Sequence, residues 1–262
     1  MTLSTRTTFT AALPQLDVYS LREDWALAAA LENHWMLLAE SLGLSPSRWI
    51  DTAGDRMYGA VIALSTRYDL DAPVLEDDAV TARTTIEAIE KPHAVSTTRF
   101  EVGGASRLEV RLLTSFIKRR QKGSNKRFSK VRDLWTAEDH DAGIVAEWLD
   151  RHHAAKSFED AGAVALETEI NRMRDFNTAD FMYFKNYIRF AKAAEWCENR
   201  GRPVRLNARR DCFFFGNVDD GDLMETRVHR DGDRLQTTHH APDGRRIFVS
   251  RAQTAPVTIA ER

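Results

Sequence analysis

The chain has 262 residues, which is enough for one large domain or for two smaller ones that each bury a core. Hydrophobic residues make up 43% and charged residues 29%, as in an ordinary globular protein, and the net charge of −2 provides no global field for attracting nucleic acid or a membrane. No apolar run reaches the ~18 residues of a membrane span, no signal-peptide pattern is present, and the two cysteines, Cys197 and Cys212, stand in no metal-binding pattern. We therefore expect a cytoplasmic protein with no metal, no nucleic acid and no membrane as partners.

The first half of the chain predicts one helix followed by strands. Apolar residues recur at spacings of three and four over residues 22–42, which predicts a helix with one apolar face, and Gly43 follows as its C-cap. β-branched residues with partial alternation come next, and Gly103 with Gly104 marks a hairpin turn. The strands predicted in this half span residues 58–69, 79–91, 94–102 and 106–118.

The second half repeats this order. An aromatic-rich helix is predicted over residues 181–199, and two Asp-Gly pairs mark later hairpin turns. Between the halves, residues 118–132 carry eight Lys or Arg and no acidic residue, and residues 137–161 are expected to be helical. We therefore divide the chain into an N-terminal unit, 1–135, which includes the basic linker, and a C-terminal unit, 136–262. The strands predicted in the second half span residues 204–216, 222–231, 234–241 and 245–256.

The two halves also align residue by residue. Asp17 and Asp175 are 158 residues apart, and the same offset places Gly216 opposite Tyr58. An offset that holds without gaps over about forty residues predicts two copies of one structural unit. The simplest packing wraps each antiparallel sheet around its helix, and only the first copy then has a tyrosine at the corner before its strands.

The N-terminal half contains the motifs Leu16–Trp25, His34-Trp35 and Gly54–Tyr58, and the C-terminal half contains Asp175-Phe176-Asn177, Tyr183-Phe184, Tyr187 and Gly216-Asn217. In this order and spacing, the motifs resemble the two units of the leinamycin-pathway acyltransferase/decarboxylase family. The resemblance covers nearly the whole chain. It implies an α+β double hotdog fold, and we expect a pocket between the two units.

The resemblance also implies acyl-thioester chemistry in polyketide-type biosynthesis. Enzymes of that family take methylmalonyl from coenzyme A, decarboxylate it and deliver the acyl group to the phosphopantetheine thiol of an acyl carrier protein. The family's catalytic tyrosine corresponds to Tyr58, and coenzyme A enters as a substrate thioester, so no cofactor is implied. A double hotdog already contains the pair of units that single hotdogs form by dimerising, so a monomer or a homodimer is expected.

Each candidate site residue also has a purely structural interpretation. Tyr58 would act as a nucleophile, donate a hydrogen bond to a thioester or enolate oxygen, or only pack. Arg56 would hold a substrate carboxylate or stay solvated, and Asn177 would cap the second helix or meet the acyl carbonyl. His34 is a weaker candidate for substrate binding, because a lone helical histidine is more often part of the core. Further candidates for substrate contacts are Tyr183 and Asn217.

The basic segment 118–132 is either a solvated linker or a docking surface for coenzyme A phosphates or an acidic carrier protein. Two other functions stay open. One is thioester hydrolysis, with Asp24 or Asp180 as the base, or dehydration of a 3-hydroxyacyl carrier protein. The other is a non-catalytic module that binds an acyl carrier protein. The docking candidates are Lys118, Arg119, Arg120, Lys126 and Arg127.

Overall fold

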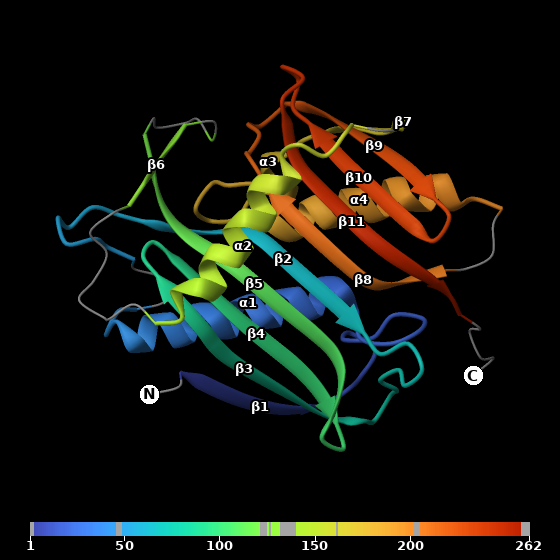
Figure 1. Cartoon of the computed structure of the whole chain (residues 1–262), viewed down its shortest axis with the longest axis horizontal. Coiled ribbons are helices and arrows are strands. Elements are labelled where there is room, and N and C mark those ends of the chain that lie inside the picture. The colour runs from blue at the N-terminus through green and yellow to red at the C-terminus, as the bar shows by residue number, and fades with distance from the viewer. Residues whose placement is uncertain are drawn as a thin grey trace.

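The computed structural model contains a continuous antiparallel sheet with helices on both of its faces (Figure 1). Each half of the chain has a long helix followed by antiparallel strands, as predicted, and an additional strand precedes each helix. The structure describes residues 3–45, 49–120, 125, 127–131, 140–160, 162–201 and 205–257. The first half contains β1 (Ser4–Thr10), α1 (Glu23–Ser41), β2 (Tyr58–Tyr68), β3 (Ala79–Glu90), β4 (His93–Val102), β5 (Ala105–Arg119) and β6 (Phe128–Lys130). The second half contains α2 (Ala142–Ala155), β7 (Ala163–Glu169), α3 (Arg172–Asp175), α4 (Phe184–Asn199), β8 (Arg205–Phe214), β9 (Leu223–Asp231), β10 (Arg234–His240) and β11 (Arg246–Pro256).

The strands lie in the order β1-β3-β4-β5-β2-β8-β11-β10-β9-β7, and β6 pairs with β5 beside this path. At the centre, β2 and β8 pair antiparallel, with Ala63 opposite Phe213 and Arg67 opposite Arg209. This pair is the seam between the two units. Each unit is a helix wrapped by an antiparallel sheet, which is the predicted double hotdog arrangement.

Both long helices lie against the same face of the sheet (Figure 1). Leu27 and Leu31 of α1 share one hydrophobic cluster with Ile188 of α4, and each such side chain stabilises the fold by about 1.5–3 kcal/mol when fully buried. The helix α2 lies on the opposite face, where Trp148 belongs to a cluster that also contains Phe213 of the second unit. Because that cluster includes strands from both units, α2 covers the seam and holds the two halves together.

Four elements are not predicted by the sequence patterns. The edge strand β1 is rich in threonine and mostly exposed, so it lacks the apolar alternation that marks a half-buried strand. The edge strand β7 was also missed, and α3 spans only four residues, too few to show a helical period. The strand β6 lies inside the predicted basic linker, which therefore folds back on β5. The predicted boundary between residues 135 and 136 lies outside the described residues.

The repeat exists, but its register differs from the ungapped alignment. The helices α1 and α4 start at Glu23 and Phe184, which are 161 residues apart. In the turn before each helix, the side chain of Asp17 accepts two backbone hydrogen bonds from its own turn, and Asn177 does the same. Asp17 therefore corresponds to Asn177 and not to Asp175. The turn before α4 contains one residue more than the turn before α1, and a sequence offset alone does not reveal that insertion.

The alignment of Tyr58 with Gly216 is also wrong. Tyr58 begins β2, whereas Gly216 follows the end of β8. The first described residue of β8 is Arg205, only 147 residues after Tyr58. Fewer residues join α4 to β8 than join α1 to β2, so the sequence offset between corresponding elements is smaller after the long helices than before them. Antiparallel pairing at the seam still brings Tyr58 and Gly216 to the same end of the sheet.

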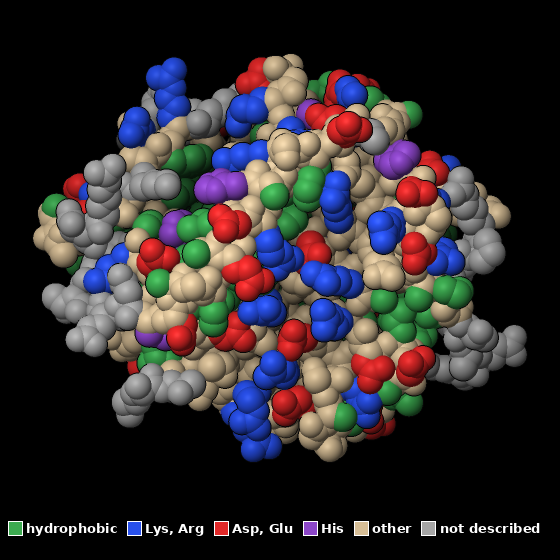
Figure 2. All heavy atoms as spheres, viewed as in Figure 1, with side chains coloured by type: hydrophobic (Ala, Val, Ile, Leu, Met, Phe, Trp, Pro, Cys, Tyr) green, Lys and Arg blue, Asp and Glu red, His purple; other side chains and the backbone are tan. Residues whose placement is uncertain are grey.

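The outer face of the sheet around α2 carries charges of both signs, intermixed (Figure 2). Ion pairs join the strands there, such as Arg99 of β4 with Glu109 of β5 (2.9 Å) and, across β4, Arg111 of β5 with Glu87 of β3 (2.8 Å). Surface pairs of this kind contribute about 0–1 kcal/mol each to the free energy of unfolding, so they add little to the stability of the fold. None of the helices in the described ranges has both the length and the apolar character needed to cross a membrane.

Candidate functional site

A cavity of about 250 Å³ lies at one end of the seam. The start of β2 and the end of β8 border it, together with the loop 176–183 and the first turn of α4. Leu31 and Trp35 of α1 complete the lining, so both units contribute to one site. The lining is mainly apolar and aromatic with a few polar groups, which is the usual character of a small-molecule site. The predicted location of the pocket between the units is consistent with this cavity.

Two asparagines supply side-chain amide groups to the cavity. The Oδ1 atom of Asn177 accepts hydrogen bonds from the backbone N–H groups of Ala179 (3.0 Å) and Phe181 (3.2 Å). The Oδ1 atom of Asn217 accepts from the backbone N–H of Val218 (2.9 Å). These bonds fix which atom is oxygen, and within the described chain neither Nδ2 group has a partner. The cavity is therefore lined by two amide groups whose N–H donors are available to a ligand.

The proposed capping role of Asn177 is wrong. The N-cap of α4 is Tyr183, and no side chain caps that helix. Asn177 instead closes the turn before the helix. Because α4 starts at the cavity without a side-chain cap, the positive end of its dipole lies beside the two amide donors.

Tyr58 lies beside the cavity, next to the lining residue Gly59. Its ring packs edge-on against Phe181, with ring centroids 5.1 Å apart. Two guanidinium carbons, of Arg56 and Arg119, lie 5.3 and 5.5 Å from the ring centroid of Tyr58. The Tyr58 hydroxyl has no hydrogen-bond partner among the residues that the structure describes. Arg56 is exposed and forms no ion pair there, so a substrate carboxylate remains a possible partner for it.

Arg119 is part of the site's framework. Its Nη2 group donates to the carbonyl oxygens of Ala179 (2.8 Å) and Asp180 (3.0 Å), and its guanidinium lies 4.2 Å from the centroid of Phe181. Because Arg119 ends β5 of the first unit, it ties that unit to the loop before α4. The cation–π contact with Tyr58 orients the phenol at the same point.

The other docking candidates differ in how available they are. Lys118 forms ion pairs with Asp51 and Asp55, so its charge is already compensated. Arg120 and Arg127 are exposed beside the cavity residue Phe128. Lys126 lies outside the described residues. A docking role therefore stays a prediction, and it rests mainly on Arg120 and Arg127.

His34 has no nitrogen left for a substrate. It is fully buried, with Nδ1 2.8 Å from the Ser96 hydroxyl and Nε2 2.8 Å from the Thr114 hydroxyl. Burial lowers the pKa of His34 to about 3, so the ring is neutral near pH 7. The predicted substrate-binding role of His34 is not supported, because the ring instead links α1 to β4 and β5.

Two tyrosines of α4 border the cavity in different ways. The Tyr187 hydroxyl donates to the carbonyl oxygen of Gly216 (3.0 Å), which holds the end of β8 against the helix. Tyr183 lines the cavity, and burial raises the pKa of its phenol, while its contact with a substrate stays a prediction. Neither phenol is therefore a base near pH 7.

No Asp, Glu, His or Cys side chain is among the described residues that line this cavity. Asp24 pairs with Arg22 at the surface, and Asp180 pairs with Arg172 (2.7 Å between Nε and Oδ1). Neither suggested base therefore faces the cavity. The described residues also contain no group of three or more side chains able to hold a metal ion.

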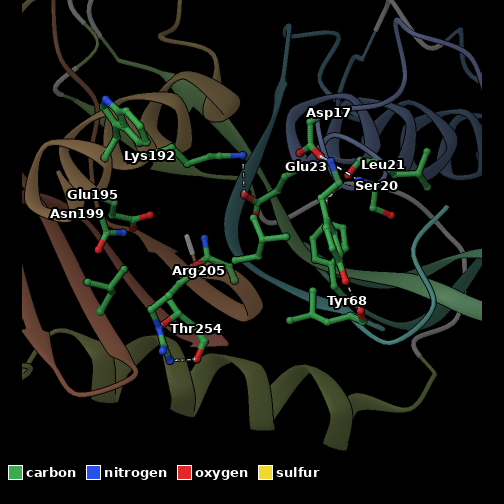
Figure 3. A pocket seen from close by; sticks show the side chains of 16 residues that line it. Asp17, Ser20, Leu21, Glu23, Tyr68, Lys192, Glu195, Asn199, Arg205 and Thr254 are labelled. Atoms are coloured by element: carbon green, nitrogen blue, oxygen red, sulfur yellow. Dashed lines mark hydrogen bonds and ion pairs between the residues drawn. The ribbon is translucent and has the colours of Figure 1, made fainter. Parts of the chain in front are cut away.

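A second cavity, of about 280 Å³, lies at the other end of the seam (Figure 3). Glu23, Lys192 and Glu195 line it, and together with the buried Arg210 behind them they form an ionic cluster. The fully buried Arg210 guanidinium binds Glu195 (2.8 Å) and Glu23 (3.2 Å), and Lys192 lies 3.6 Å from Glu23. Burial opposes ionisation of Glu23, but Arg210, Lys192 and Thr66 outweigh it and lower the pKa of this carboxyl.

The sequence interpretation missed this ionic cluster. Glu195 occupies the apolar stripe of α4, seven residues after Ile188 and four after Ala191. A charged residue on such a stripe is the available signal, because buried charges occur with partners.

No protein-family model matches the chain, and no curated protein matches it in sequence. Solved structures match its fold over nearly the whole length. The 12:0-ACP thioesterase from Umbellularia californica has a TM-score of 0.70 at 11% identity, covering 97% of this chain and 95% of that chain. An acyl-ACP thioesterase from Bacteroides thetaiotaomicron VPI-5482 has a TM-score of 0.65 at 10% identity, covering 96% and 98%. HtdX of Mycobacterium tuberculosis has a TM-score of 0.58 at 10% identity, covering 96% and 100%. The chain is a double hotdog, and at these identities the likeness shows the fold alone.

Proposed function

We propose that this chain is an enzyme acting on acyl thioesters, which bind in the cavity at the Asn177 end of the seam. The observation that carries the proposal is the pair of amide donors on Asn177 and Asn217, whose oxygens are held by backbone N–H groups. Two donors placed in an apolar cavity stabilise negative charge that develops on a carbonyl oxygen. The uncapped start of α4 adds to that field.

The reaction we favour is loss of CO₂ from a malonyl-type thioester, followed by acyl transfer to a carrier protein. The bond between Cα and the carboxylate breaks, CO₂ leaves, and the electron pair passes to the enolate oxygen. A proton then returns to Cα, the carrier thiol attacks the carbonyl, and its proton passes to the departing sulfur, so that coenzyme A leaves as the thiol. The enolate needs hydrogen-bond donors and no carboxylate base, which agrees with the described lining. Tyr58 would supply a hydrogen bond, the proton, or a nucleophile.

A second candidate is thioester hydrolysis, favoured by the structural neighbours that are described as acyl-ACP thioesterases. The same donors would stabilise the oxyanion of a tetrahedral intermediate. Hydrolysis also needs a base that activates water, and none is among the described lining residues. Dehydration has the same difficulty. Attack by the carrier thiol depends less on a base, because a thiol is partly ionised near pH 7 and water is not. Both alternatives therefore rank below decarboxylation with transfer.

The acyl carrier protein would dock beside Arg120 and Arg127. These exposed guanidiniums lie on the β5–β6 side of the cavity, next to Phe128, and suit an acidic partner. Reversing both charges to Glu should raise the KM for the carrier and leave the KM for the coenzyme A substrate unchanged. The same reversal at Arg234, an exposed residue of β10, is the control. An unchanged KM for the carrier would exclude this docking site.

The deciding experiment is incubation with methylmalonyl-CoA and a phosphopantetheinylated carrier protein, followed by intact-mass spectrometry of both. Propionyl on the carrier supports decarboxylation with transfer. Methylmalonyl on the carrier supports transfer alone, and propionyl-CoA alone supports decarboxylation alone. Free acid from a panel of acyl carriers supports hydrolysis. Binding of thioesters without turnover would contradict an enzymatic role and support a binding module.

A further inference from the structure

Trp35 forms the wall of the cavity on the side of α1. A Cβ atom built on Gly59 would lie 2.4 Å from Cη2 and 2.5 Å from Cζ2 of Trp35. The six-membered ring of the indole therefore rests directly on the backbone of β2. Gly59 is needed here for close approach, because any side chain would meet the ring.

The indole is locked in this position. Its ring centroid lies 5.8 Å from that of Trp49, 5.6 Å from that of Phe116 and 4.7 Å from that of His34. His34 is itself fixed by hydrogen bonds on both nitrogens. Trp35 packs against the central hydrophobic cluster and also against a second cluster that contains Trp49 and Met57. It therefore separates the cavity from packed side chains, and it acts as a fixed wall.

We propose that Trp35, seated on Gly59, sets the upper limit of acyl chain length, and that the enzyme takes short acyl groups. This inference rests on the proposed function. The cavity of about 250 Å³ is smaller than the ~300–1,000 Å³ typical of ligand sites, so it holds the acyl group and thioester while the rest of the carrier stays outside. A longer chain cannot pass Trp35, because Trp49 and Phe116 pack against the ring.

The second unit provides a matched control. Trp196 occupies the same position in α4 as Trp35 does in α1, 161 residues later. It borders the second cavity and is 66% exposed. Its replacement removes an indole from the same fold without changing the wall of the first cavity.

The test measures the affinity of coenzyme A thioethers, which resist cleavage, with side chains of acetyl, butyryl, hexanoyl and octanoyl length. Isothermal titration calorimetry compares the wild type with Trp35→Leu and Trp196→Leu. The wild type should bind the two shorter analogues and lose affinity for the longer ones. Trp35→Leu should gain about fourfold in affinity for each further methylene that becomes buried. Trp196→Leu should keep the wild-type profile.

Gly59→Ala combined with Trp35→Leu gives a second test. The added methyl group occupies part of the vacated space, so the double variant should prefer intermediate lengths. If Trp35→Leu does not fold, Trp35→Phe replaces it with a smaller expected gain. A wild type that binds octanoyl as well as butyryl, or an unchanged profile in the folded Trp35 variant, would overturn the role of Trp35. Failure of the wild type to bind any analogue would instead overturn the proposed function.

Discussion

The two ends of the β2–β8 seam carry cavities built from corresponding elements, yet their chemistry is opposite. Each is bordered by the turn before one helix, by the first turn of that helix and by the later half of the other helix. At one end the turn holds Asn177 and the helix begins with Phe184. At the other end the turn holds Asp17 and the helix begins with Glu23.

The later halves of the helices diverge in the same way. At positions 161 residues apart, Leu31 and His34 of α1 correspond to Lys192 and Glu195 of α4. In the ionic cavity the charged groups bind one another across the seam, mainly through Arg210. In the apolar cavity the amide donors keep their hydrogen-bonding capacity. At one end of the seam the charged groups are therefore paired with one another across the two units, whereas at the other end the amide donors have no partner among the described residues.

The largest effect is expected when the ionic cluster at one end of the seam is disrupted. Arg210→Met leaves Glu23 and Glu195 buried without their main partner and should lower the free energy of unfolding by about 3–5 kcal/mol, measured by urea denaturation. Arg209→Met, at the neighbouring half-buried position, should cost less than about 1 kcal/mol. The pKa of Glu23 is lowered from 4.5, so the stabilisation that its ionised form provides is lost as pH falls below 4.5. The difference in the free energy of unfolding between the wild type and Arg210→Met should therefore become smaller at low pH. Equal losses for both variants would contradict this role of Arg210.

The next effect concerns the amide donor. Asn177→Asp keeps the oxygen that accepts the turn's N–H groups, as Asp17 does in the first unit, but replaces Nδ2 with a second oxygen. Activity, measured as kcat/KM for the acyl thioester, should fall about 10²–10³-fold. The reverse exchange, Asp17→Asn, should leave kcat/KM unchanged. Retention of full activity by Asn177→Asp would remove the donor from the mechanism.

A smaller effect is expected at the edge of the cavity. Tyr58→Phe removes the free hydroxyl and keeps the ring between Arg119 and Phe181. Loss of a hydrogen bond to a charged group corresponds to about 1.5–3 kcal/mol, so kcat should fall by roughly tenfold to hundredfold. Tyr68→Phe, which loses the hydroxyl bonded to the Leu21 carbonyl at the ionic end, is the control and should change stability rather than kcat. A fully active Tyr58→Phe enzyme would show that the phenol only packs.

The smallest effect is expected from protonation of His34, which occupies in α1 the position that Glu195 occupies in α4. Burial lowers the folded pKa of His34 to about 3 from 6.5, so the unfolded chain binds more protons between these values and stability falls as pH drops through that range. From neutral pH to pH 5.5 the loss from His34 should be about 1.4 kcal/mol. Urea denaturation across this range measures it, and His34→Gln should reduce the slope. His239, whose pKa burial lowers to about 4, adds a second contribution of the same sign. A flat profile above pH 5.5 would contradict the buried neutral state.

Periodicity and turn residues were sufficient to predict both long helices and most strands, because these signals are local. The helix predicted over 22–42 runs from Glu23 to Ser41, and the strand predicted over 106–118 is contained in β5. The edge strands β1 and β7 were not predicted, because an exposed strand such as β1 lacks apolar alternation.

Local sequence patterns specify two helix-and-sheet units, each with an apolar helix stripe that needs a sheet to cover it. Only the tertiary structure decided the register of the repeat, since inserted and deleted loop residues are invisible to an ungapped offset. It also decided which polar groups stay free: His34 and Asn177 both looked like candidates, but Ser96 and Thr114 occupy both nitrogens of the first. Hydrogen bonding between residues far apart in the chain depends on the packed fold, so local sequence cannot reveal it.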